Sequence, residues 1–172
     1  METSNGGSIS ITSEQGKINA TRAIQSFSEG GNAGDVTLKA QTDITANTIS
    51  SHGKQEGGQI TITSETGNID TSSGNLLANY SGGGDAGDIT MEAPQGNITT
   101  NDIYSYADGD GGQISIKAGN NINIKVNSNI ISASEPPNEG NSDKQGQGGD
   151  ITLEAGNNIN TCLLYTSPSP RD

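Results

Sequence analysis

Acidic residues near a lysine are the first feature of this sequence that suggests chemistry. Asp88 and Glu92 are four residues apart in a segment that alternates apolar and polar residues, and Lys117 lies in the next such segment. Enzymatic β-helices cluster carboxylates with basic residues on one strand face, and glycoside hydrolysis needs two carboxylates about 5–9.5 Å apart. Because Thr90 separates Asp88 from Glu92, the sequence favours a solvated face with stacked charges. We therefore assign no catalytic residue.

Aspartate and glycine together suggest calcium. The segment Asp108-Gly109-Asp110-Gly111-Gly112 begins like an EF-hand loop, but Gly119 stands where the bidentate glutamate is needed. The nine-residue calcium-binding β-helix repeat also fails, because the aspartates recur far more widely than every nine residues. Asp85, Asp108 and Asp110 are candidates for adventitious calcium binding on a loop, and solvated turns are the simpler interpretation. We expect no metal and no cofactor.

Three further patterns have simpler structural explanations. The string Gly82-Gly83-Gly84-Asp85-Ala86-Gly87 matches G-x-G-x-x-G, but a dinucleotide site needs a following helix, and a strand pattern follows here. His52, the only histidine, has no serine or cysteine constellation around it, so we expect a loop residue. Tyr80, Tyr104 and Tyr106 form a candidate sugar-stacking patch or cap the edge of the core.

The elements that position these residues are six Gly-flanked segments of one design, which we call anchors. They begin their apolar alternation at intervals of 24 to 37 residues, which is typical of a solenoid. The anchors are Gly7–Ile11, Gly34–Leu38, Gly58–Ile62, Gly87–Met91, Gly112–Ile116 and Gly149–Leu153.

Two weaker strand patterns follow each anchor. The second is centred on Ile18, Ile44, Ile69, Ile98, Ile122 and Ile159, and the third lies around Ile24/Phe27, Ile49, Leu76/Leu77, Ile103 and Ile130/Ile131. Gly-Asn and Asn-Asn precede the second strand, which suggests corners with a left-handed backbone. We therefore expect an all-β chain folded as a right-handed parallel β-helix. Its coils have about 25 residues and three short strands, with five complete coils and the start of a sixth.

Stacking the anchors aligns equivalent residues into columns. Two inward columns are entirely aliphatic or methionine, and a hydroxyl row lies between them at Ser10, Thr37, Thr61, Thr90, Ser115 and Thr152. In the outward column Thr12, Lys39, Thr63, Glu92, Lys117 and Glu154, adjacent charges have opposite signs. Odd anchors read Gly-Gly-(Ser/Gln)-Ile and even anchors read Gly-Asp-(Val/Ile), which indicates growth by duplication of two-coil blocks.

The composition of the chain indicates which classes of partner to expect. The chain has a formal net charge of −12, with 28% hydrophobic and 3% aromatic residues. An acidic chain lacks the cations that bind phosphates, so we expect no nucleic-acid partner. No segment approaches the roughly 20 apolar residues of a transmembrane helix, so we expect no membrane insertion. Such polarity is typical of disorder, but strict alternation at fixed intervals favours a fold with a thin shared core.

These motifs resemble the repeat region of filamentous-haemagglutinin-like exoproteins, the β-helical passengers of two-partner secretion. The likeness is carried by residues 148–160 (GGDITLEAGNNIN) and 112–122 (GQISIKAGNNI), and it covers residues 1–161. The resemblance implies a secreted protein of the bacterial cell surface that leaves through an outer-membrane pore and acts as an adhesin. Its implied partners are glycans or proteins on host or neighbouring cells. The signal and secretion domain that the family uses are not found in these residues.

The last eleven residues break the pattern. Residues 162–172 (CLLYTSPSPRD) resemble one reading frame of a sequencing adapter, and we interpret them as a non-native tail. Residues 1–161 are then a β-helix fragment of a longer rod. We expect a structural and adhesive segment without catalysis. Two alternatives remain. A β-helical carbohydrate-active enzyme fragment would show a cleft of convergent acids. An ice-binding solenoid would show paired columns of threonine.

Overall fold

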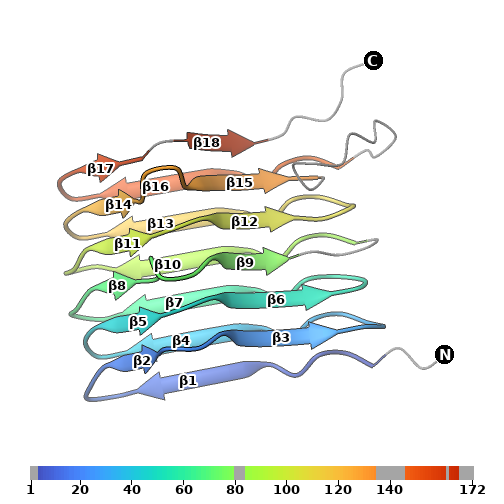
Figure 1. Cartoon of the computed structure of the whole chain (residues 1–172), viewed down its shortest axis with the longest axis horizontal. Coiled ribbons are helices and arrows are strands. Elements are labelled where there is room, and N and C mark those ends of the chain that lie inside the picture. The colour runs from blue at the N-terminus through green and yellow to red at the C-terminus, as the bar shows by residue number, and fades with distance from the viewer. Residues whose placement is uncertain (1–3, 80–83, 135–145, 162, 167–172) are drawn as a thin grey trace.

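The chain folds entirely into short parallel strands. The computed structural model describes residues 4–79, 84–134, 146–161 and 163–166, and over these residues it contains eighteen strands and no helix. The strands form three parallel sheets of six strands each, with every third strand in the same sheet (Figure 1). In that part of the chain no helix exists that is long and apolar enough to cross a membrane. The predicted parallel β-helix with three strands per coil is confirmed.

Sheet A is built from the six anchors. Its strands are β1 (Ile9–Ser13), β4 (Val36–Ala40), β7 (Ile60–Ser64), β10 (Ile89–Ala93), β13 (Ile114–Ala118) and β16 (Ile151–Ala155). Their register is the predicted one, because Ile9 pairs with Val36, Val36 with Ile60, and so on to Ile151. We number the coils 1 to 6 by these strands.

Sheets B and C complete each coil. Sheet B contains β2 (Ile18–Ala20), β5 (Ile44–Ala46), β8 (Ile69–Asp70), β11 (Ile98–Thr100), β14 (Ile122–Ile124) and β17 (Ile159–Asn160). Sheet C contains β3 (Ile24–Ser28), β6 (Ile49–Gly53), β9 (Leu76–Asn79), β12 (Ile103–Tyr106), β15 (Asn129–Ala133) and β18 (Leu163–Thr166). We call the connection from sheet C to sheet A the entrance corner and that from sheet A to sheet B the exit corner.

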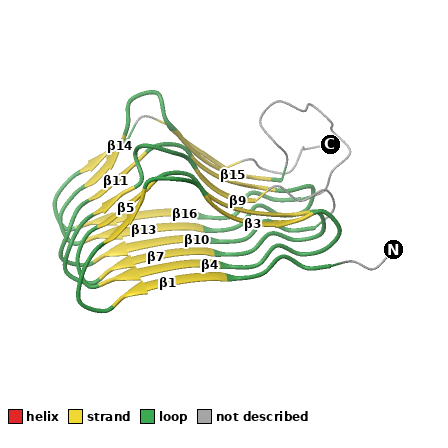
Figure 2. Ribbon diagram, turned by 60° about the horizontal axis from the view of Figure 1, so that its bottom comes forward, coloured by secondary structure: helices red, strands yellow, loops and turns green. Residues whose placement is uncertain are grey.

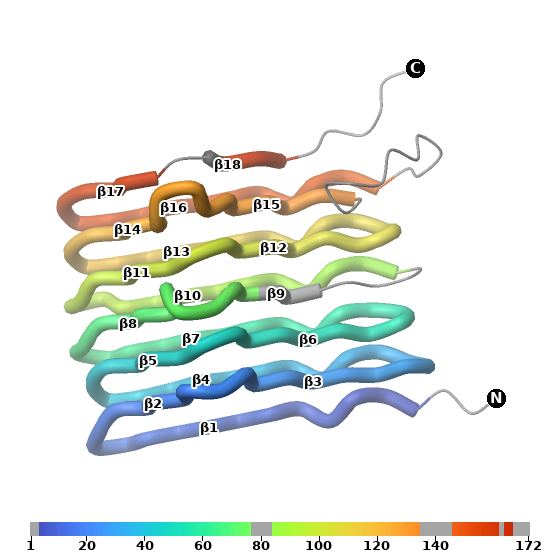
Figure 3. The backbone as a smooth tube through the Cα atoms, viewed as in Figure 1, coloured from blue at the N-terminus to red at the C-terminus, as the bar shows by residue number. Residues whose placement is uncertain are grey.

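The winding of the chain is visible from the N-terminal end. In Figure 2 the sheet A strands run leftward along the bottom and the chain returns rightward through sheets B and C while it recedes from the viewer. This is a right-handed coil, as predicted. The connections β8–β9 and β14–β15 depart from the otherwise regular path (Figure 3). Lys125 in the second of these donates from Nζ to the Ser72 carbonyl in the first, at 2.8 Å.

A thin aliphatic core fills the space between the sheets. The inward residues of sheet A in coils 2 to 5, such as Val36, Leu38, Ile60 and Ile62, are fully buried. Their columns meet the inward isoleucines of sheet B and the first apolar residues of the sheet C strands in coils 1 to 5. Each coil contributes only a few such side chains, so burial comes from stacking on the coils above and below. This arrangement explains how so polar a chain encloses a core.

Two regions need comment. Leu163–Thr166 forms β18, paired with β15, so residues assigned to the tail by sequence occupy the third strand of coil 6. Their adapter origin stays a prediction. Tyr80, Gly82, Gly83 and residues 135–145 of the predicted long loop lie outside the described residues.

The predicted left-handed backbone conformation at the corners is wrong. Among the described residues no glycine has positive φ, and Asn127 (φ 66°) is the one non-glycine that does. Glycine is required at the entrance corner by close approach between coils. A Cβ on Gly58 would lie 2.6 Å from the Gly34 carbonyl carbon and 2.6 Å from Ser51 Oγ.

Candidate functional site

Opposite charges stack on the outer face of sheet A. Glu92, Lys117 and Glu154 occupy one column, because Glu92 pairs with Lys117 and Lys117 with Glu154. Lys117 Nζ lies 3.5 Å from Glu154 Oε2, and these two side chains are 48% and 60% exposed. The predicted column of alternating charge is therefore confirmed, and its side chains are exposed to solvent.

A groove of about 470 Å³ runs beside this column in coils 4 to 6. Pro94, Gly119 and Gly156 each follow the last alanine of a sheet A strand, so its floor carries little side-chain bulk. The groove is lined by Glu92, Pro94, Lys117, Ala118, Gly119, Glu154, Ala155 and Gly156. The groove therefore combines small residues with the charges of Glu92, Lys117 and Glu154.

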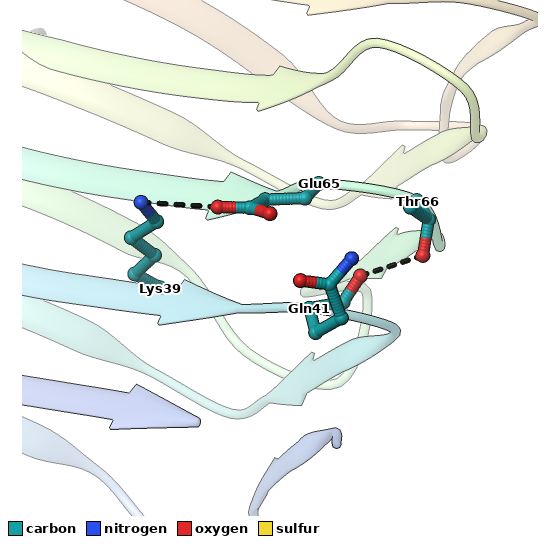
Figure 4. A network of polar contacts seen from close by, with 4 residues as sticks. All are labelled: Lys39, Gln41, Glu65 and Thr66. Atoms are coloured by element: carbon teal, nitrogen blue, oxygen red, sulfur yellow. Dashed lines mark hydrogen bonds and ion pairs between the residues drawn. The ribbon is translucent and has the colours of Figure 1, made fainter. Parts of the chain in front are cut away.

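The same corner is filled by side chains in coils 2 and 3. Gln41 and Glu65 stand in the position that Gly119 and Gly156 leave open. Lys39 Nζ lies 3.0 Å from Glu65 Oε1, and Thr66 Oγ1 donates to the Gln41 carbonyl at 2.6 Å (Figure 4). Exit-corner composition therefore decides where a groove exists.

The structure does not bring Asp88 and Glu92 together. Asp88 immediately precedes β10 and Glu92 is the fourth residue of that strand, and four residues of strand span about 13 Å. Asp88 instead lines a separate groove of about 400 Å³ with Asp85, Asp110 and Asp150. The backbones of Glu92 and Glu154 lie two strand spacings apart, about 9.6 Å, with Lys117 between them.

The candidate calcium ligands form hydrogen bonds within the protein. Asp85 Oδ1 accepts from the Asp110 backbone N–H at 2.9 Å, and Asp110 Oδ1 accepts from the Gln147 N–H at 2.8 Å. Asp35 and Asp88 accept in the same way from Gln59 and Gln113, at 2.9 and 2.8 Å. Within the described ranges, no three His, Cys, Asp or Glu residues are grouped so as to hold a metal ion. Asp85 and Asp110 therefore bridge successive coils.

His52 is not a loop residue, which corrects the sequence interpretation. It lies in β6 on the outer face of sheet C, where it pairs with Phe27 of β3 at a ring-centroid distance of 5.3 Å. Burial lowers the pKa of His52. The prediction failed because Gly53 and Lys54 suggest a turn, whereas the strand extends through Gly53.

Tyr104 and Tyr106 lie on the same outer face, in β12. Their ring centroids are 6.3 Å apart in an edge-on arrangement. Burial raises the pKa of Tyr104, a hydrogen bond with Asn129 opposes this shift, and Asp102 adds to it. With Phe27, which is 56% exposed, and His52, these rings make sheet C the aromatic side of the molecule. We call these four residues the aromatic face.

The hydroxyl row lies in the predicted register on the outer face of sheet A. Ser10 pairs with Thr37, Thr37 with Thr61, Thr61 with Thr90, and the row continues to Thr152. The column beside it holds Lys39, Glu92 and Lys117 as well as threonine, so the surface is charged.

Sequence reasoning missed a set of buried serines at the entrance corner. Ser51 Oγ donates to the Gly34 carbonyl at 2.8 Å and accepts from the Gly58 N–H at 3.0 Å, so one hydroxyl joins two successive anchors. The same pair of bonds is formed by Ser26, Ser105 and Ser132. The available signal was a serine two residues after the first apolar residue of the third strand.

An amide ladder at the exit corner was also missed. Every member except the last accepts on Oδ1 from the backbone N–H and side-chain Nδ2 of the asparagine in the next coil, at 2.8–3.2 Å. Its members are Asp43, Asn68, Asn97, Asn121 and Asn158. The asparagines that suggested turns therefore connect coils.

Comparison with known proteins leaves the family open. No family model, no curated protein and no solved structure matches the chain. The fold thus rests on the structure, and the haemagglutinin-like resemblance rests on the motifs quoted above.

Proposed function

We propose that this chain is a structural and adhesive segment of a rod, belonging to a large secreted exoprotein of the bacterial surface, and that it performs no catalysis. The observation that carries the proposal is the unchanged register of sheet A through six coils, with aliphatic residues inward and polar residues outward. Each added coil lengthens such a body by about 4.8 Å without changing its cross-section. A chain of this kind provides reach and a repeated surface.

The aromatic face is the part we assign to adhesion. Phe27, His52, Tyr104 and Tyr106 present rings to the exterior on a protein with few aromatic residues. Rings of this kind stack on sugars and anchor protein contacts. The partners we propose are glycans or proteins on host or neighbouring cells. Export through an outer-membrane pore follows from the family resemblance alone.

Binding of coated beads tests this proposal. Beads carrying residues 1–172 are applied to arrays of glycans and host-surface proteins, and bound fluorescence is measured. We expect binding that falls about tenfold in the double variant Phe27→Ser/Tyr106→Ser, as for loss of two anchor side chains. The matched control Thr37→Ser/Thr61→Ser on sheet A retains binding. Failure to bind any surface, or equal loss in both variants, contradicts the adhesive role.

One observation favours a second function. Glu92, Lys117 and Glu154 beside the groove resemble the mixed charges of carbohydrate-active β-helices. Incubation with neutral and acidic polysaccharides, followed by measurement of new reducing ends and unsaturated products, addresses it. Product formation that disappears in Lys117→Ala would establish the enzyme and overturn the structural proposal. For the ice-binding alternative we expect no thermal hysteresis.

A further inference from the structure

We propose that the rod has a hinge between coils 3 and 4, which opens at the entrance corner and pivots about sheet B. We call the contacts between two successive coils a seam. The three sheets of a coil surround the core, and sheet B lies across it from the corner that joins sheets C and A (Figure 2). The hinge is a property of the fold and does not depend on the adhesive role.

Side chains join the entrance corners of the four other seams. Each of these seams has a serine bridge. A second column of side chains adds further bonds: Asn5 Oδ1 accepts from the Asn32 N–H at 3.1 Å, and Asn32 Nδ2 donates to Glu56 Oε2 at 2.7 Å. Asp85 and Asp110 continue this column across the seams that follow coils 4 and 5. Two columns therefore connect the coils at each of these four seams.

The seam between coils 3 and 4 lacks both connections. Within the described residues, no side-chain hydrogen bond joins the entrance corners of these two coils. The Gly58 carbonyl and the Gly87 N–H stand where a serine hydroxyl joins the two glycines at other seams, and both residues are buried. Neither group has a hydrogen-bond partner among the described residues. Because buried backbone groups without partners destabilise a fold, this seam is the weakest at the entrance corner.

The backbone also departs from regularity on this side of the seam. One N–H of each entrance corner donates to a carbonyl of the next coil, at 2.8, 2.9, 3.1, 2.8 and 2.7 Å along the five seams. The longest of these bonds, from the Gly57 N–H to the Asp85 carbonyl, crosses from coil 3 to coil 4. In sheet C the pairing of β9 with β12 shifts at the same seam, between Tyr104 and Ser105.

The same seam is well connected around sheet B. The amide ladder crosses it without a break. Thr71 Oγ1 donates to Thr100 Oγ1 at 2.9 Å, and both residues are buried. Lys125 of coil 5 reaches past coil 4 to the Ser72 carbonyl of coil 3. A seam that is held around sheet B and lacks side-chain bonds at the opposite corner opens by rotation about sheet B.

The hinge lies between the two halves of the aromatic face. Phe27 and His52 belong to coils 1 and 2, whereas Tyr104 and Tyr106 belong to coil 4. Opening of the seam therefore changes the spacing between the two pairs of rings. If the aromatic face is the adhesive surface proposed above, this motion adapts it to contacts of different spacing.

Native-state hydrogen exchange of the full chain, followed by NMR, tests the hinge. Protection factors are compared between amides that hold the same position at different seams: Gly57 with Ala33 and Ala86 at the entrance corner, and Ile69 with Ile44 in sheet B. We expect Gly57 to be at least about tenfold less protected than Ala33 and Ala86, and Ile69 to be protected within about threefold of Ile44. Equal protection of Gly57 and Ala33 overturns the hinge. Loss of protection at Ile69 as well overturns the pivot about sheet B.

A variant that supplies a missing bond should close the hinge. Asp35 Oδ1 accepts from the Gln59 N–H at 2.9 Å across the preceding seam. Gln59→Asn gives coil 3 a side chain of the same shape without adding a charge, so that its Oδ1 accepts from the Asp88 N–H of coil 4. We expect the protection factor of Gly57 to rise at least about fivefold, as for one added hydrogen bond.

The matched control makes the same change at a seam that is already connected. Gln113→Asn lies between coils 5 and 6, where a serine bridge and the Asp110 carboxylate join the entrance corners. We expect the protection factor of Gly111 in this variant to change by less than about twofold. Circular dichroism verifies the fold of both variants. No gain at Gly57 in Gln59→Asn, or an equal gain at Gly111 in the control, overturns the hinge.

Discussion

The two corners that bound sheet A follow different rules. At the entrance corner every strand is preceded two residues earlier by glycine, and in four coils a buried serine joins that glycine to the next. At the exit corner the connection has three or four residues, and its first position is Glu14, Gln41, Glu65, Pro94, Gly119 or Gly156. The glycine before each sheet A strand is therefore constant, although the rest of the entrance corner varies in length, whereas the first residue of the exit corner varies in type and is exposed or partly exposed.

The two corners therefore affect different properties of the molecule, namely the register of the coils and the chemistry of the surface. The entrance-corner glycine of coils 2 to 6 lies so close to the preceding coil that a methyl group does not fit. Exit-corner glycines such as Gly67, Gly96 and Gly119 lie equally close, but coil 2 has no glycine there and the position of the glycine changes between coils. The groove beside Lys117, the ion pairs and the amide ladder lie along this corner of variable residue type. We infer that the fold is fixed at the entrance corner and that the outer surface varies at the exit corner.

Adding one methyl group to the entrance-corner glycine of two different coils tests the close approach most strongly. Gly58→Ala places a Cβ against the Gly34 backbone and Ser51 Oγ, and overpacking of this kind costs about 3 kcal/mol of unfolding free energy. Gly7→Ala, at the matching position of coil 1, meets nothing within 4 Å, so we expect a change below about 1 kcal/mol. Urea unfolding followed by circular dichroism measures both. Equal effects at the two positions would refute the role of close approach at the entrance corner.

Removal of a serine bridge is expected to have the next largest effect. Ser51→Ala leaves the buried Gly34 carbonyl and Gly58 N–H without the Oγ that joins them, which costs about 1–3 kcal/mol. The exposed hydroxyl of Ser10 is the matched control, and Ser10→Ala should change the unfolding free energy by less than about 0.5 kcal/mol. If both alanine variants unfold at the same urea concentration, the bridge does not stabilise the stack.

Coil 3 shows what the bridge does for register. Its third strand carries Ala78 where coils 1, 2, 4 and 5 carry serine, and the pairing of β9 with β12 shifts between Tyr104 and Ser105. The steps that retain the serine on both strands, such as β3 with β6, pair without a shift. The hydroxyl therefore coincides with regular pairing in sheet C.

The periodicity of the sequence predicted the strands but not the contacts that successive coils make at the corners. Columns such as Ile9, Val36 and Ile60 could be aligned because alternation has a period of two and fixes which side faces the core. The serine bridges escaped prediction because they depend on how sheet C lies over the entrance corner, a distance that spacing in one strand does not contain. The groove escaped because it results from side chains that are absent at Gly119 and Gly156.

The smallest expected effect lies at the exit corner. Lys39 and Glu65 form an ion pair of 3.0 Å, but their side chains are 54% and 42% exposed, so water screens the attraction. Lys39→Ala should therefore lower the unfolding free energy by only about 0–1 kcal/mol, and less at high salt. A double-mutant cycle with Glu65→Ala, measured by urea unfolding at two salt concentrations, isolates the pair. A coupling as large as the effect of Ser51→Ala would mean that the exit corner helps to fix the register, and the division between the two corners would fail.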